Sequence, residues 1–108
     1  MDKALQEMYE TILDRKVHRE EGSYTSYLFD KGMEKILKKV GEESTEVVIA
    51  AMAKDHEGLV EELNDLAYHL LVLMVEADVT PEEFVAVVEK RAEKTHNLKP
   101  ERKPIENL

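Results

Sequence analysis

The sequence lacks cysteine and has no long apolar run. No stretch approaches the roughly 20 apolar residues that a helix needs to cross a bilayer. The first ten residues, MDKALQEMYE, are amphipathic and acidic, which is not typical of a secretory signal. Together with the absence of cysteine, these features predict a soluble cytoplasmic protein.

Basic residues are scarce relative to acidic ones. The 15 Lys and Arg residues face 24 Asp and Glu residues, which gives a formal net charge of -9. A phosphate backbone seeks a basic surface, so this balance argues against direct binding of nucleic acid. A small anionic substrate would need a bound cation to bridge it to such a protein. The sequence also has no glycine-rich phosphate loop, nucleophile elbow or Cys/His pair.

Glycine and proline are also few, with four and three copies among 108 residues. Stripes of apolar residues at a helical period are long, whereas the alternation typical of strands is not evident. The sequence therefore predicts an all-α protein, a bundle of about four to five helices in one domain. We assign that domain to residues 1–95 and expect residues 96–108, which contain two prolines, to form an irregular tail.

Capping signals divide the domain into five expected helices. Ser23, Asp55 and Thr80 are suited to the N-cap position, and Thr80 is followed by Pro and Glu in a capping box. Gly32 is suited to end a short helix. The expected helices lie at about residues 3–16, 24–32, 33–54, 57–77 and 81–94.

Two stretches are apolar on almost every side of their helices. They are Val47–Ala53 and Leu66–Val75, on consecutive expected helices. A helix that is apolar all round should be covered on more than one side. A chain of this size gains from pairing with a second copy, so we expect a homodimer to complete the bundle.

Pairs of acids lie directly beside these apolar stretches. Glu43 and Glu46 are three residues apart on one helix, and Glu62 and Asp65 are three apart on the next. Each pair shares a helical face, and antiparallel packing through the short KDHEG turn would bring the two pairs level. Carboxylates that converge need a counter-charge, and oxygen ligands suit Mg²⁺. The pattern favours a magnesium site.

Other readings of these residues stay open. In a chain this acidic, the pairs could instead lie on solvated faces. Lys38 and Lys39 could be solvated or meet a phosphate, and Lys39 lies one turn before Glu43. The GSYT segment, with Ser23, Tyr24 and Thr25, is either a turn and cap or a substrate contact. His69 lies one turn after Asp65, and we expect a hydrogen-bonded core residue there rather than a ligand.

The acidic motif resembles that of a known superfamily. E-x-x-E at Glu43 to Glu46, followed after fifteen residues by E-x-x-D at Glu62 to Asp65, resembles the metal motif of the all-α nucleoside triphosphate pyrophosphohydrolases, which include MazG. Within it, EGSYTSYLFDKGMEKILKKVGEESTEVVIAA and DLAYHLLVL are similar to the phosphoribosyl-ATP pyrophosphohydrolase family of histidine biosynthesis. The likeness covers about Leu5 to Val88. The tail and Asn64 depart from the pattern.

The resemblance implies an activity and a set of site residues. It implies hydrolysis of phosphoribosyl-ATP to phosphoribosyl-AMP and pyrophosphate, the second step of histidine biosynthesis, in a homodimer. Mg²⁺ would be held by Glu43, Glu46, Glu62 and Asp65, and Glu42 would join them or orient a water. The proposed catalytic residues are thus Glu42, Glu43 and Glu46. The substrate contacts expected beside them are Lys38, Lys39, Ser23, Tyr24 and Thr25.

Two alternatives remain at this stage. A house-cleaning pyrophosphohydrolase for free nucleotides would share the metal site, and would differ in whether the GSYT segment contacts an extra phosphoribosyl group. A non-catalytic helical dimerisation module would bind divalent metal weakly or not at all.

Overall fold

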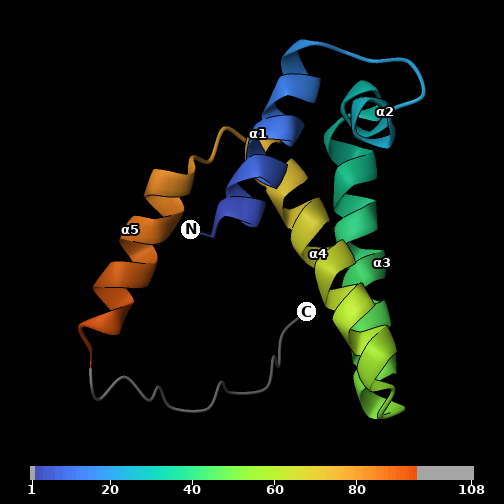
Figure 1. Ribbon diagram of the computed structural model, residues 1–108, viewed down its shortest axis with the longest axis vertical. Helices are drawn as coiled ribbons and strands as arrows, with labels where there is room; N and C mark the ends of the chain where they lie inside the picture. Colours follow the sequence, from blue (N-terminus) through green and yellow to red (C-terminus); the bar gives the residue numbers. More distant parts are fainter. Residues whose placement is uncertain (1, 95–108) are drawn as a thin grey trace, which may run out of the picture.

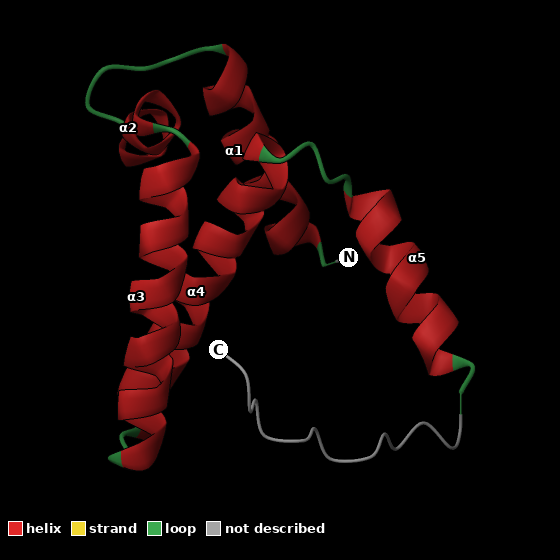
Figure 2. Ribbon diagram, turned by 180° about the vertical axis from the view of Figure 1, so that it is seen from behind, coloured by secondary structure: helices red, strands yellow, loops and turns green. Residues whose placement is uncertain are grey.

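The computed structural model describes residues 2–94, and within that range every regular element is a helix (Figure 2). The elements are α1 (Lys3–Val17), α2 (Tyr24–Lys31), α3 (Met33–Met52), α4 (His56–Glu76) and α5 (Pro81–Ala92). The predicted all-α class is confirmed, and the predicted helix ends agree to within two residues. The irregular tail predicted for residues 96–108 lies outside the described residues.

The helix starts follow the capping residues identified in the sequence. The Ser23 hydroxyl accepts a hydrogen bond from the backbone N–H of Ser26, at 3.1 Å. The Asp55 carboxylate and the Thr80 hydroxyl cap α4 and α5 in the same way, at 3.0 and 3.1 Å. Gly32 separates α2 from α3 with a φ of 85°, a left-handed value that favours glycine. These caps fix where each helix begins.

Helices α3 and α4 form a long antiparallel hairpin (Figure 1). The turn between them comprises Ala53–Asp55, and Lys54 adopts a left-handed φ of 58° that reverses the chain. This pair packs together more extensively than any other pair of described helices. The predicted antiparallel packing through the KDHEG segment is therefore confirmed.

The hydrophobic core lies where α1 and α2 pack against the end of this hairpin. Helix α1 packs against α2 and α4, and α2 also packs against α3. The buried core residues come from all four helices and are Ile12, Leu28, Phe29, Ile36, Val72 and Val75. The core thus holds together the start of α3 and the second half of α4, the end of the hairpin away from its turn, with the acidic residues between the core and the turn.

The apolar run Val47–Ala53 is not covered within one chain, contrary to its buried appearance in the sequence. Ala50 is buried, but Val48, Ile49 and Met52 are 59%, 61% and 80% exposed. The reason is that α1 and α2 cover only the other end of the hairpin (Figure 1). This part of α3 therefore presents an apolar face to solvent.

Helix α5 stands apart from the other helices (Figures 1 and 2). It makes no extensive packing contact with any of α1 to α4. Its side chains Phe84, Val87 and Val88 are about half exposed and line a shallow hollow along the helix. Among residues 2–94, no helix is long and apolar enough to span a membrane.

Candidate functional site

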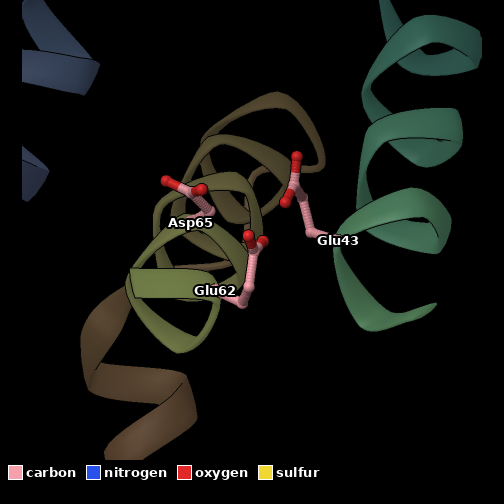
Figure 3. A group of neighbouring side chains, drawn as sticks. All are labelled: Glu43, Glu62 and Asp65. Atoms are coloured by element: carbon pink, nitrogen blue, oxygen red, sulfur yellow. The ribbon is translucent and has the colours of Figure 1, made fainter. Parts of the chain in front are cut away.

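Three acidic side chains converge between the two helices of the hairpin (Figure 3). Glu43 comes from α3, and Glu62 and Asp65 come from α4. One carboxylate oxygen of each lies within 4.8 Å of the corresponding oxygens of the other two. The antiparallel register predicted from the spacing of the acids has thus brought these three together. We call them the carboxylate cluster.

Burial is uneven across the carboxylate cluster: Glu43 is buried, Glu62 is partly buried and Asp65 is exposed. Glu43 is only 6% exposed, and Oε2 of Glu43 and Oε2 of Glu62 are both buried without a hydrogen-bond partner. A buried polar oxygen without a partner is costly, and a buried charge without a counter-charge costs more. Oxygen ligands in such a group suit a hard divalent cation. The residues present therefore fit a magnesium ion held between α3 and α4.

Glu46 lies against the cluster rather than within it. A hydrogen bond with the Glu46 carboxyl group, together with burial and the charges of Glu46, Asp65 and Glu43, raises the pKa of Glu62 from 4.5 to about 7. Glu46 itself is exposed. Two carboxyl groups at hydrogen-bond distance can share one proton, which relieves their repulsion. The clustered negative charges thus make Glu62 harder to ionise than an ordinary glutamate.

Lys39 is the positively charged side chain that pairs with an acid of the carboxylate cluster. Its Nζ atom lies 3.3 Å from a Glu42 oxygen and 3.5 Å from a Glu43 oxygen. Burial lowers the pKa of Lys39, but the hydrogen bond to Glu42 and the charges nearby outweigh it, so that the net pKa is raised. Glu42 therefore pairs with Lys39, and it is not one of the three clustered acids.

The start of α2 contacts α4 beside the cluster. Tyr24 Oη lies 2.8 Å from Nε2 of the buried His69, and His69 Nδ1 lies 2.7 Å from the backbone oxygen of Asp65. The Tyr24 ring stacks on the rings of Tyr27 and Tyr68. Burial raises the pKa of Tyr24; the charge of Glu43 adds to the rise, and Lys39 opposes it. His69 is thus a hydrogen-bonded core residue, as predicted.

The remaining predicted contacts lie in different surroundings. Ser23 caps α2, and Thr25 is buried beneath it. Lys38 is exposed and lines a separate hollow with Lys31, Glu34 and Lys35; within residues 2–94 no ion pair joins it to an acid. Substrate contact by Lys38, Ser23 and Thr25 stays a prediction. The link between Tyr24 and His69 was not predicted, since no local spacing relates residues so far apart.

Comparison with known proteins identifies the family to which the chain belongs. The sequence profile of the family described as Phosphoribosyl-ATP pyrophosphohydrolase matches residues 5–92. The "Phosphoribosyl-ATP pyrophosphatase" of Clostridium novyi is 51% identical over 96% of this chain and 94% of its own length. The protein of the same name from Clostridium acetobutylicum is 50% identical over 100% of both chains.

A further relative carries this region within a longer chain. The "Histidine biosynthesis bifunctional protein HisIE" of Thermoanaerobacter pseudethanolicus is 58% identical over 76% of this chain, which corresponds to 38% of that protein. The family profile covers all or most of each of the five described helices and includes every residue of the carboxylate cluster. The chain belongs to the phosphoribosyl-ATP pyrophosphohydrolase family, and it is an enzyme of the hydrolase class.

Proposed function

We propose that the protein hydrolyses phosphoribosyl-ATP to phosphoribosyl-AMP and pyrophosphate in histidine biosynthesis, and that it requires Mg²⁺. The observation that carries the metal requirement is the carboxylate cluster, with its two buried oxygens that lack a partner. The family and the names of its relatives support the substrate and the pathway. The acidic net charge of -9 also favours a metal, because an anionic substrate would otherwise be repelled.

The proposed ligands are Glu43, Glu62 and Asp65, with Glu46, which lies against Glu62, as the fourth. When bound, Mg²⁺ neutralises the charge of the triphosphate and polarises the bond that breaks. Glu46 is exposed at the edge of the cluster and is suited to accept a proton from the attacking water. Glu42 would orient that water through its contact with Lys39.

Lys39 is the proposed contact to the substrate phosphates. Its ammonium group already lies between Glu42 and Glu43, on the exposed side of the cluster. Glu42 also holds this ammonium, so Lys39 would keep a carboxylate partner while it donates to a phosphate oxygen. Tyr24, at the start of α2, is the proposed contact from the GSYT segment, with Ser23 and Thr25 shaping its backbone.

We further propose that the enzyme is a homodimer. Val48, Ile49 and Met52 on α3 and Val60 and Leu63 on α4 expose apolar side chains around the hairpin. Helix α5 has an apolar face that no other described helix covers. A second copy would bury both surfaces at about 25 cal/mol per Å². Within this proposal, residues 1–95 form the pyrophosphohydrolase domain, residues 96–108 lie outside it, and the enzyme works in the cytoplasm.

An assay of pyrophosphate release tests the proposed function. Phosphoribosyl-ATP and a panel of ordinary nucleoside triphosphates would be compared, each with Mg²⁺ and with a chelator. The proposal expects release from phosphoribosyl-ATP that depends on Mg²⁺ and exceeds release from any free triphosphate. Preference for a free triphosphate would identify a house-cleaning enzyme instead, and activity that survives the chelator would refute the metal requirement.

A further inference from the structure

A hydrogen-bonded chain joins the start of α2 to the backbone of a proposed metal ligand. Tyr24 Oη lies 2.8 Å from His69 Nε2, and His69 Nδ1 lies 2.7 Å from the carbonyl oxygen of Asp65. His69 is 5% exposed, so water does not compete for either bond. The mechanism proposed above does not use His69.

The partners of His69 determine where its proton lies. A backbone carbonyl can only accept a hydrogen bond, so Nδ1 must carry a proton to bond with Asp65. In a neutral imidazole, the other nitrogen then has a lone pair and no proton. Nε2 is therefore an acceptor, and the Tyr24 hydroxyl donates to it. Burial raises the pKa of Tyr24, which keeps this hydroxyl protonated.

This arrangement limits what Tyr24 offers to a ligand. Its single hydroxyl proton is taken by His69, so the oxygen has only lone pairs to offer to a further partner. Tyr24 is 45% exposed, and its ring stacks on Tyr27 and Tyr68 with centroids 6.2 and 6.4 Å away. The Tyr24 side chain is thus partly exposed and held in a restricted orientation. Phosphate oxygens are acceptors too, so they are poor partners for it.

We infer that His69 is a positioning residue, which holds Tyr24 as a hydrogen-bond acceptor for a sugar hydroxyl of the substrate. The inference rests on the proposed function, because it takes a nucleotide substrate as given. It assigns different parts of the substrate to different residues. The phosphates belong to Lys39 and the metal site, while a ribose hydroxyl donates to Tyr24.

Kinetic measurements on four single variants and one double variant test this role. Tyr24→Phe and His69→Phe should each raise KM about 3- to 10-fold, the effect of losing one hydrogen bond. The KM of the double variant should not exceed the higher KM of the two single Phe variants, since the two side chains act together. His69→Gln keeps a hydrogen-bond acceptor for the Tyr24 hydroxyl, so its KM should stay within about twofold of the wild-type value. The kcat and the Mg²⁺ midpoint should change by less than about twofold throughout.

Tyr27→Phe is the matched control. Tyr27 is 42% exposed and stacks on Tyr24, but no hydrogen bond to its hydroxyl is found among the described residues. Tyr27→Phe also removes a phenolic hydroxyl from this group of stacked tyrosine rings, and it should leave KM unchanged. If Tyr24→Phe leaves KM unchanged, or if the effects of the two Phe variants multiply in the double variant, the inference is wrong.

A spectroscopic readout separates this inference from the proposed function. At about pH 8 an ordinary histidine is neutral. Nitrogen-15 NMR at this pH should show that Nδ1 of His69 is protonated and that Nε2 is not. Tyr24→Phe should shift the Nε2 resonance, and Tyr27→Phe should not. A proton on Nε2 would refute the inference even in a fully active enzyme. Wild-type protein without activity toward phosphoribosyl-ATP would refute the proposed function, while the resonances would still decide which group donates.

Discussion

The ammonium group of Lys39 lies 3.5 Å from a carboxylate oxygen of Glu43, one helical turn further along α3. Glu43 is almost fully buried. Among residues 2–94, Lys39 is the only positively charged side chain that forms a salt bridge with the carboxylate cluster. Lys39 therefore supplies a counter-charge to Glu43. Its second contact, 3.3 Å to Glu42, gives the same ammonium group a partner nearer the surface.

Lys39→Met should raise the KM for phosphoribosyl-ATP about 10-fold or more, because a charged hydrogen bond to phosphate is lost. The Mg²⁺ midpoint should be unchanged or lower, since a positive charge beside the cluster has been removed. Lys35→Met, one turn earlier on α3, provides the control for net charge. Parallel losses of substrate and metal affinity would mean that Lys39 shapes the metal site rather than binding phosphate.

Glu46→Gln and Asp65→Asn should each abolish most Mg²⁺-dependent hydrolysis. Without metal, the thermal midpoint of either variant should equal or exceed that of the wild type, because one charge has left a repulsive group. With Mg²⁺, the wild type should gain more stability than the variants, since it binds the ion more tightly. Melting curves with and without Mg²⁺, beside the pyrophosphate assay, measure both effects.

Glu61→Gln is the control for these substitutions, since Glu61 is an exposed acid on α4 next to Glu62. It removes the same charge and should leave both activity and the response to Mg²⁺ unchanged. Destabilisation of the metal-free protein by several kcal/mol in Glu46→Gln or Asp65→Asn would instead indicate a structural acid.

The raised pKa of Glu62 predicts how the stability of the metal-free protein depends on pH. The pKa is about 7 in the folded protein against an ordinary value of 4.5, so between these values the folded protein binds more protons than the unfolded chain. The free energy of unfolding should therefore fall as the pH rises from 4.5 to about 7. Denaturation at a series of pH values, without Mg²⁺, measures this slope.

Glu62→Gln should flatten that dependence, because it removes the titrating group. In the wild type, Mg²⁺ should bind more tightly as the pH approaches 7 and should release protons as it binds, since the ligands must be ionised. A slope that is unchanged in Glu62→Gln would assign the titration to another group.

The dimer proposal predicts that Ile49→Lys yields a monomer. Ile49 is 61% exposed in one chain, and a charge in a buried apolar interface is strongly unfavourable. Light scattering at micromolar concentration should report a dimer for the wild type and a monomer for the variant. Thr11→Lys, which adds the same charge at an exposed polar position of α1, should stay dimeric. A monomeric wild type would refute the proposal.

Most of the helical architecture was predictable because its signals are local. Ser23, Asp55 and Thr80 cap their helices through bonds to residues three positions away, and such bonds can be read directly from the sequence. The carboxylate cluster was predictable for a related reason. A short turn between two long helices fixes their register, so equal distances from the turn identify facing residues.

The features that escaped prediction depend on how elements meet in space. The spacing did not reveal that Glu46 would lie against Glu62 and outside the group of three, because helix rotation decides which oxygens converge. The apolar run from Val47 to Ala53 indicates burial, but it does not say whether the covering surface belongs to the same chain. Tyr24 and His69 meet only through the packing of α2 on the hairpin.

The turn Ala53–Asp55 has a consequence for how the enzyme acquires its site. All three clustered acids belong to one hairpin whose halves are joined by a tight turn, so bringing them together closes a short loop at a small entropic cost. Contacts between residues close in sequence require less loop closure, and proteins rich in them fold faster. The acids should therefore meet before the rest of the chain has packed, and their mutual repulsion then opposes the nascent hairpin. Divalent cations present during refolding should therefore increase the refolding rate. The ion would then assist folding as well as catalysis.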